Sequence, residues 1–290
     1  MIQSMTGFGK TIAELPNKKV TVEIKALNSK QMDILVRSVP TYREKEMEIR
    51  SLLSQTLERG KVEFIITVEH TGASADTMIN TAVLESYKNQ IETISQKFGL
   101  KTPDDWFPML MRLPEVITTD AEELDEEEWK VVYNAINEAI NKLQEFRIQE
   151  GAMLGKFFEQ KIARIAELLK SIEPYENERI EKIRSRIMEN LYNVPEIQVD
   201  INRLEQEMIY YIEKLDINEE KSRLDNHLKY FLKTLGGGEG QGKKLGFIVQ
   251  EIGREINTLG SKSNHAEMQQ IVVRMKDELE QIKEQILNVL

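Results

Sequence analysis

The sequence has no cysteine, and aromatic residues make up only 7% of its 290 positions. Without cysteine the chain can form neither a disulfide scaffold nor a thiolate metal site, and thiol-based catalysis is excluded. The N-terminus lacks a signal-peptide core, and no apolar run reaches the roughly 18 residues of a membrane-spanning helix. We therefore expect a soluble, cytoplasmic protein in which any bound metal has oxygen and imidazole ligands.

Basic residues are in deficit, since 39 Lys and Arg stand against 49 Asp and Glu, a formal net charge of −10. This balance argues against a nucleic-acid-binding protein, because contacts to phosphates need Lys and Arg. The charge is uneven, however. Residues 1–61 contain 11 Lys and Arg and 7 Asp and Glu, a charge of +4, which leaves −14 for residues 62–290. A basic N-terminal part is compatible with an anionic ligand.

The first 70 residues show the two-residue alternation of half-buried strands. This pattern predicts strands at 6–13, 20–26, 32–36 and 62–68, with a helix over 42–57 before the last strand. From about residue 80 onward apolar residues recur at helical spacing. Helices are predicted over 82–98, 129–172, 176–191, 202–216, 219–235, 243–258 and 264–290.

The predicted fold class is α+β. A β-rich N-terminal domain of antiparallel strands plus a helix is followed by a mostly helical C-terminal region with long amphipathic helices. We expect an N-terminal domain over 1–150, a helical connector over 151–205 and a helical C-terminal domain over 206–290. The last helix carries a continuous apolar stripe, which could pack either within the chain or on a second copy.

A glycine-rich loop at 236–242 resembles the start of a phosphate-binding loop, because Gly237 and Lys243 have the required spacing. The motif is incomplete: Lys244 replaces the expected Ser or Thr, and a helix rather than a strand precedes the loop. We interpret the loop as a linker between two helices. It places Lys243 and Lys244 at a helix start, where phosphate would be attracted.

One polar stripe lies on the predicted helix 219–235. Asp216, Glu220, Arg223 and His227 follow one another at helical spacing, and Glu219 lies beside them. Carboxylates and imidazole can ligate a divalent metal, and a guanidinium can pair with phosphate. The same spacing is typical of a surface ladder of ion pairs, which spacing alone favours.

A second polar stripe lies on the predicted helix 243–258. Glu251 and Glu255 are four residues apart, so both carboxylates point to the same side, with Arg254 nearby. The helix ends in polar residues that include Asn257 and Lys262. Two such carboxylates could bind Mg²⁺ or Mn²⁺ while the cations bind phosphate. A solvated helix face explains the spacing equally well.

Seven ordered motif blocks extend over nearly the whole chain. The first two are MIxSMTGFG at 1–9 and EIKALNSK at 23–30. The third consists of Glu46, Arg50 and the motif RGKV at 59–62. The next three are RxxEG at 147–151, DIxEE at 216–220 and RLxxH at 223–227, and the seventh, within 242–262, consists of GKKL, QE, RE and NTLGSK. In this order they resemble the YicC/YloC family of bacterial proteins. Lys30 replaces a family Arg, Gly246 replaces an Asp, and Gly253 replaces an Asn.

The resemblance implies a metal-dependent endoribonuclease that cleaves single-stranded or structured RNA by phosphodiester hydrolysis. It also implies a divalent cofactor, Mn²⁺ or Mg²⁺, and a ring-like homo-oligomer, in this case a hexamer. Both polar stripes coincide with motif blocks, so the resemblance favours a functional role for them. The alternatives are a non-catalytic RNA-binding adaptor that recruits another nuclease, and cleavage through the 2′-hydroxyl with His227 as base and no catalytic metal.

On this basis we expect three groups of functional residues. Catalytic roles are expected for Arg223, His227, Glu251, Arg254 and Glu255. Metal ligation is expected from Glu219, Glu220, His227, Glu251 and Glu255. Contacts to RNA are expected from Lys30, Arg37, Lys243, Lys244, Asn257 and Lys262.

Overall fold

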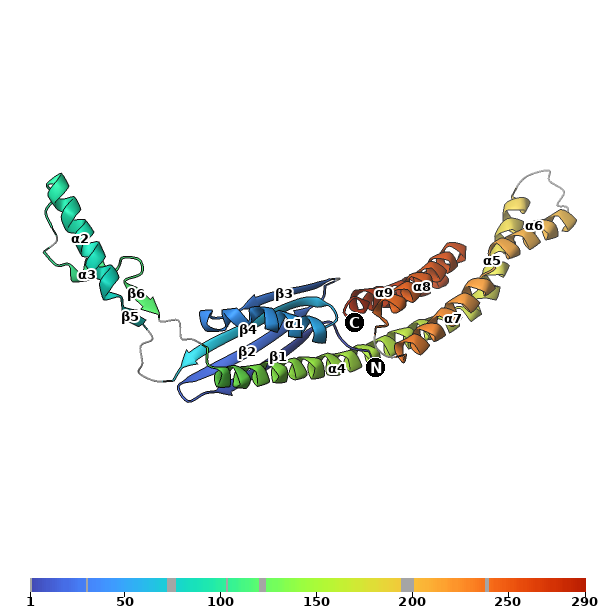
Figure 1. The fold of residues 1–290 in the computed structure, drawn as a ribbon. Coiled ribbons are helices and arrows are strands. Elements are labelled where there is room, and N and C mark those ends of the chain that lie inside the picture. The colour runs from blue at the N-terminus through green and yellow to red at the C-terminus, as the bar shows by residue number, and fades with distance from the viewer. Residues whose placement is uncertain are drawn as a thin grey trace.

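The computed structural model describes residues 2–29, 31–71, 77–102, 104–119, 124–193, 201–237 and 240–290. Figure 1 shows an elongated molecule with a β-sheet near its middle. A single long helix, α4 (Glu126–Lys170), runs along the sheet and continues into a helical region beyond it. The expected α+β class is confirmed.

The sheet has the strand order β1-β2-β4-β3. Its strands are β1 (Gly7–Glu14), β2 (Lys18–Leu27), β4 (Gly60–His70) and β3 (Met32–Arg37). The expected antiparallel pairing holds for β1, β2 and β4, whereas β3 pairs parallel to β4. The 3₁₀ helix η1 (Pro40–Lys45) and helix α1 (Glu46–Thr56) connect these two strands. A parallel pair needs such a crossover, and strand periodicity does not reveal it.

The sheet has one covered face and one open face. Helices α1 and α4 cover one face, where Val22, Ile24 and Phe64 are buried in the same core as Ile136 and Leu143 of α4. The alternate residues of each strand lie on the other face and are more exposed. Basic and acidic residues are equally frequent at these positions, so the open face has no net charge: they are Lys10, Lys19, Lys25, Arg37 and Lys61 against Glu14, Glu23, Asp33, Glu63 and Glu69.

A second core lies in the helical region. It is formed by the C-terminal half of α4 together with α7 (Asn218–Leu235), α8 (Gly242–Lys262) and α9 (Ala266–Ile286). Phe158 of α4 and Phe231 of α7 meet edge to face at its centre, with 5.9 Å between ring centroids. Because α4 continues across Gly151, as predicted, it connects the sheet core and the helical core.

Smaller units lie at the two ends of the molecule (Figure 1). At one end are α2 (Thr81–Phe98) and α3 (Phe107–Leu110) with the short strands β5 (Thr77–Ile79) and β6 (Ile117–Thr119). The sequence pattern predicted α2 but not α3, β5 or β6, since these elements are only three or four residues long. Within the described residues, no helix has both the length and the apolarity to cross a lipid bilayer.

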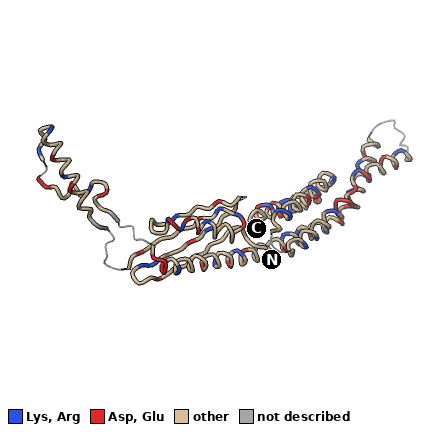
Figure 2. The backbone as a smooth tube through the Cα atoms, in the orientation of Figure 1, with Lys and Arg blue, Asp and Glu red and all other residues tan. Residues whose placement is uncertain are grey.

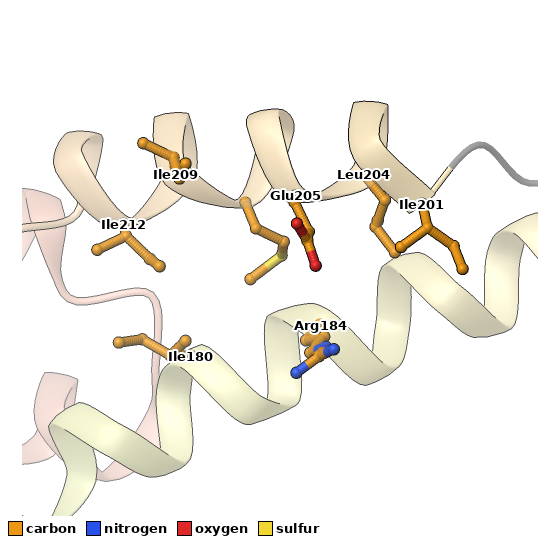
Figure 3. Close-up of a pocket in the computed structure, with 8 residues that line it drawn as sticks. Ile180, Arg184, Ile201, Leu204, Glu205, Ile209 and Ile212 are labelled. Atoms are coloured by element: carbon orange, nitrogen blue, oxygen red, sulfur yellow. The ribbon is translucent and has the colours of Figure 1, made fainter.

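The opposite end is a hairpin of α5 (Glu173–Tyr192) and α6 (Ile201–Lys214). Between the two helices lies a groove of about 350 Å³, shown in Figure 3. Arg184 of α5 and Glu205 of α6 lie on opposite walls. The other lining residues are apolar: Ile180, Ile201, Leu204, Met208, Ile209 and Ile212. Among the described residues neither Arg184 nor Glu205 has an ion-pair partner.

Candidate active site

Helices α7 and α8 form an antiparallel hairpin, and two contacts between them fix its register. Near the glycine loop, Lys244 Nζ lies 5.1 Å from the ring centroid of Tyr230. At the other end, Lys262 Nζ forms an ion pair of 2.7 Å with Glu220 Oε1. These contacts place the two predicted polar stripes on the same side of the hairpin.

We call this side the polar face. On each helix its residues recur at intervals of three, four or seven, the spacing of one helical stripe. They are Glu220, Arg223, His227 and Tyr230 on α7, and Lys244, Glu251, Glu255 and Lys262 on α8. The register places Arg223 and His227 between the two end contacts, at the level of Glu251 and Glu255. The structure thus brings together two stripes that the sequence predicted separately.

Two carboxylates of the polar face are buried. Glu220 is 6% exposed and Glu255 is 5% exposed, although ionised carboxylates are almost never buried without a reason. Lys262 compensates one oxygen of Glu220, and the other oxygen, Oε2, is buried without a hydrogen-bond partner among the described residues. The surface-ladder interpretation therefore fails for Glu220, and the solvated-face interpretation fails for Glu255.

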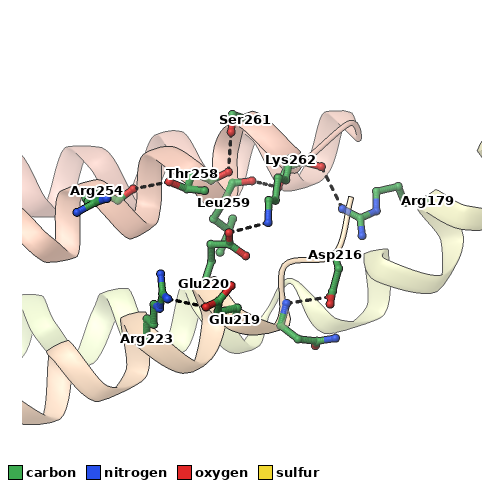
Figure 4. A network of polar contacts seen from close by, with 12 residues as sticks. Arg179, Asp216, Glu219, Glu220, Arg223, Arg254, Thr258, Leu259, Ser261 and Lys262 are labelled. Atoms are coloured by element: carbon green, nitrogen blue, oxygen red, sulfur yellow. Dashed lines mark hydrogen bonds and ion pairs between the residues drawn. The ribbon is translucent and has the colours of Figure 1, made fainter. Parts of the chain in front are cut away.

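The remaining charged residues of the two stripes are exposed. Arg223 pairs with Glu219, one turn before it, and Arg254 Nη1 lies 3.9 Å from Glu251 Oε2. Such solvent-exposed pairs contribute little stability and exchange partners easily. Figure 4 shows Arg223 with Glu219, Arg254, and the Glu220–Lys262 pair. Asp216, also drawn there, accepts a hydrogen bond of 3.0 Å from the backbone N–H of Asn218 at the start of α7.

The five predicted metal ligands are not assembled into a metal centre. Within the described ranges, no group of three or more His, Asp or Glu side chains is placed to hold a metal ion. Glu219 is engaged by Arg223, and Glu220 by Lys262. His227 is partly buried. A metal bound here would need ligands from the substrate or from water in addition to the protein carboxylates.

The predicted RNA-binding residues fall into separate places. Lys30 lies outside the described residues. Arg37 lies on the open face of the sheet, where its Nη2 is 3.1 Å from Glu63 Oε1. Lys243 is exposed at the start of α8, beside Lys244 of the polar face. Asn257 is also exposed, but it lies about 200° around α8 from Glu255 and so on the opposite side of the helix.

Comparison with known proteins identifies the family. Residues 2–156 match the N-terminal region, and residues 172–290 the C-terminal region, of the YicC-like endoribonucleases. The chain belongs to this family. The "Probable endoribonuclease YicC" of Clostridioides difficile (strain 630) is 31% identical over 296 aligned residues, and that of Haemophilus influenzae is 28% identical over 293. Both alignments cover the whole of both chains.

Two departures from the family pattern lie away from the polar face. Gly246 and Gly253 are seven residues apart on one side of α8. A Cβ on Gly253 would lie 3.2 Å from Leu279 Cδ2 of α9, whereas a Cβ on Gly246 would have no described atom within 4 Å beyond its local helix backbone. Gly246 is about 140° around the helix from Glu251 and about 180° from Glu255. An Asp at position 246 would therefore not join these carboxylates within one chain.

Other family blocks meet at the junction between the two cores. Ser4 donates its backbone N–H to Arg147 O at 3.0 Å, and Thr6 Oγ1 donates to Glu150 Oε2 at 2.7 Å. Burial lowers the pKa of Arg147 from its usual value, an effect that nearby Glu58 opposes. The family's opening block and its RxxEG block therefore hold the N-terminal segment on α4.

The C-terminus completes this junction. Met5 donates its backbone N–H to Asn288 O at 2.8 Å, and Arg59 Nη2 donates to Val289 O at 3.0 Å. The RGKV block thus anchors the last residues of the chain beside the N-terminal segment. These contacts give the first, third and fourth family blocks a structural role.

Sequence reasoning missed Arg179 on α5. Its Nη1 donates to Lys262 O at 3.2 Å, so it connects α5 to the end of α8 beside the polar face. Burial lowers the pKa of Arg179, against the opposing effect of Glu176 and Asp216. A signal was present in the sequence, because Arg179 stands four residues before the buried Ile183, at an apolar position of the stripe.

Proposed function

We propose that the protein is a divalent-metal-dependent endoribonuclease that hydrolyses phosphodiester bonds of single-stranded or structured RNA, with the polar face as its active site. The observation that carries the proposal is the pair of buried carboxylates, Glu220 and Glu255, on a face that also presents Lys244 and Lys262. Two family members aligned over their full length are named probable endoribonucleases, which supports RNA as the substrate.

In this proposal the cationic side chains act on the RNA backbone. Arg223 and Arg254 neutralise charge that develops on the scissile phosphate. Both now pair with exposed carboxylates, and exchanging such a partner for phosphate costs little. Lys243 and Lys244 position the backbone at the start of α8, and Arg37 extends the contact to the open face of the sheet.

Glu220 and Glu255 are the residues that would hold Mn²⁺ or Mg²⁺, with Glu251 at the exposed edge. A Mg²⁺ site commonly uses one or two carboxylates and completes its shell with phosphate and water oxygens. A cation would compete with Lys262 for Glu220 and would use Oε2, which has no hydrogen-bond partner among the described residues. Such an ion lowers the pKa of a bound water and offsets charge at phosphate.

The deciding experiment is incubation of the purified protein with a structured RNA, with added Mn²⁺ and with EDTA. We expect internal cleavage with Mn²⁺ and none with EDTA. Full activity in EDTA would replace the metal route by attack of the RNA 2′-hydroxyl with His227 as base. Binding without any cleavage by the pure protein would favour the adaptor function.

We also propose a homo-oligomer, with the hexamer as the expected size. The apolar groove between α5 and α6 supports a contact with the same hairpin of a second copy. Arg184 and Glu205 line the groove from opposite helices and have no ion-pair partner among the described residues, so a two-fold contact would pair each with the other residue of the second copy. Measuring the molar mass of the wild type and of Ile209→Glu in solution tests this contact.

A further inference from the structure

We infer that Tyr230 and Phe247, with the lysines around them, form a platform on which unpaired RNA bases stack. This inference rests on the proposed function and deepens it, because it names single-stranded RNA as the segment held beside the polar face. The platform lies at the loop end of the α7–α8 hairpin, and neither residue was among the predicted site residues.

Exposed aromatic rings and a local excess of positive charge coincide in this region. Tyr230 is 44% exposed and Phe247 is 58% exposed, so neither ring contributes to the buried core. Residues 229–247 contain four lysines and one glutamate, a charge of +3 in a chain that carries −10. Exposed aromatic rings among lysines are the usual means of binding single strands: rings stack on bases and lysines follow the backbone.

The contact between Lys244 and Tyr230 indicates how a nucleotide would fit. Lys244 Nζ lies over one face of the Tyr230 ring, 5.1 Å from its centroid, and the ring remains open elsewhere. A base stacked on the exposed part of the ring would bring its phosphate close to this ammonium group. A cation over an exposed ring is held only weakly, so Lys244 can turn to the phosphate.

The position of Tyr230 connects the platform to the proposed chemistry. Tyr230 stands one turn after His227 and two turns after Arg223 on the polar face. A strand stacked at Tyr230 would therefore continue along the hairpin toward Glu255 and Lys262. Duplex RNA cannot use the platform, because its bases are paired and stacked inside the helix. Stacking on the platform thus selects RNA that is unpaired next to the bond to be cleaved.

The test measures RNA binding in EDTA, where no metal-dependent cleavage occurs. The probes are an unpaired oligoribonucleotide, the same backbone with abasic positions, and a duplex of the same length. We expect Tyr230→Ala and Phe247→Ala each to weaken binding of the unpaired RNA about tenfold. Binding of the abasic strand and of the duplex should change less than twofold.

Two controls complete the design. Tyr230→Phe keeps the ring and should bind as the wild type does, whereas Lys244→Gln should weaken all three probes alike. A 2-aminopurine base in the unpaired strand should lose fluorescence on binding to the wild type but not to Tyr230→Ala. The inference would be overturned if both alanine variants bound the unpaired RNA as the wild type does. It would also be overturned if they lost as much affinity for the abasic strand as for the unpaired RNA, or if their oligomer mass differed from that of the wild type.

The test of the platform can fail independently of the test of the nuclease. Cleavage with Mn²⁺ by both wild type and Tyr230→Ala, with equal RNA binding, would leave the nuclease in place and remove the platform. Selective loss of unpaired-RNA binding in Tyr230→Ala, without cleavage by the wild type, would keep the platform and remove the nuclease.

Discussion

Gly151 and Gly155 are one turn apart in α4, but only Gly151 is packed closely against another segment of the chain. A Cβ on Gly151 would lie 2.2 Å from the carbonyl oxygen of Ile2, whereas a Cβ on Gly155 would have no described atom within 4 Å beyond its local helix backbone. The first glycine lets the N-terminal segment lie against α4. The second has no such role, and it only lowers the helix propensity.

We therefore expect Gly151→Ala to lower the free energy of unfolding by about 1–3 kcal/mol, because backbone at the junction must shift. Gly155→Ala is the matched control and should raise it by up to about 1 kcal/mol. Denaturant unfolding of the two variants measures the difference. Equal effects of the two substitutions would contradict the junction contacts.

The Glu220–Lys262 pair gives a second prediction at the scale of single residues. Lys262→Met leaves the buried Glu220 without its cation and should lower the free energy of unfolding by about 1–3 kcal/mol. Lys229→Met breaks the exposed Lys229–Asp225 pair, which is 2.6 Å long against 2.7 Å for Glu220–Lys262, and should cost less than about 1 kcal/mol. Thermal unfolding of both variants compares them, and a neutral Lys262→Met would show that Glu220 is not held as described.

Glu178 gives a prediction for pH. Its hydrogen bond from Lys182 lowers the pKa of the carboxyl below the ordinary 4.5, with a smaller contribution from His265. The folded pKa is lower than the unfolded one, so the stabilisation is present at neutral pH and is lost as pH falls below about 4.5. Lys182→Met should raise the pKa of Glu178, as NMR titration of its carboxyl carbon would detect. An unchanged pKa would rule out the interaction.

At the scale of elements, sequence periodicity predicted the long helices and the strands of the sheet. It predicted the antiparallel pairs of the sheet but not every pairing between elements. Strand β3 proved parallel to β4, and α8 extends to Lys262 rather than ending near residue 258. Periodicity reports which face of an element is buried but not which element covers it. The polar face arises from such a pairing, and the partner of Arg179 could not be predicted because it lies 83 residues away in the sequence.

The orientation of Gly246 on α8 predicts the effect of placing the family's aspartate at this position. Gly246→Asp restores the family residue, and within the described part of the chain no atom outside its own stretch of helix lies within 4 Å of the new Cβ. We expect stability to change by less than about 1 kcal/mol. Cleavage at limiting Mn²⁺ should stay within twofold of wild type, because the new carboxylate points away from Glu255. A large gain in activity would show that position 246 contributes to the site, for example from a second copy.

At the scale of the whole molecule, the net charge of −10 suggested a protein that does not bind nucleic acid. Figure 2 shows basic and acidic residues interspersed along both halves of the elongated chain. The charge that matters is local: +4 over residues 1–61, and +3 over residues 229–247. We therefore expect RNA binding with a modest salt dependence, since few phosphates are neutralised at once.

The central claim is that the carboxylates of the polar face support RNA cleavage. It is tested most directly by the double variant Glu251→Gln, Glu255→Gln, compared with Glu280→Gln, Glu284→Gln on the exposed side of α9. Both variants change the charge by the same amount at the same four-residue spacing. The account predicts that the first binds RNA like the wild type but cleaves it at least about 100-fold more slowly with Mn²⁺, while the second retains full activity. Equal cleavage rates for the two variants would contradict it.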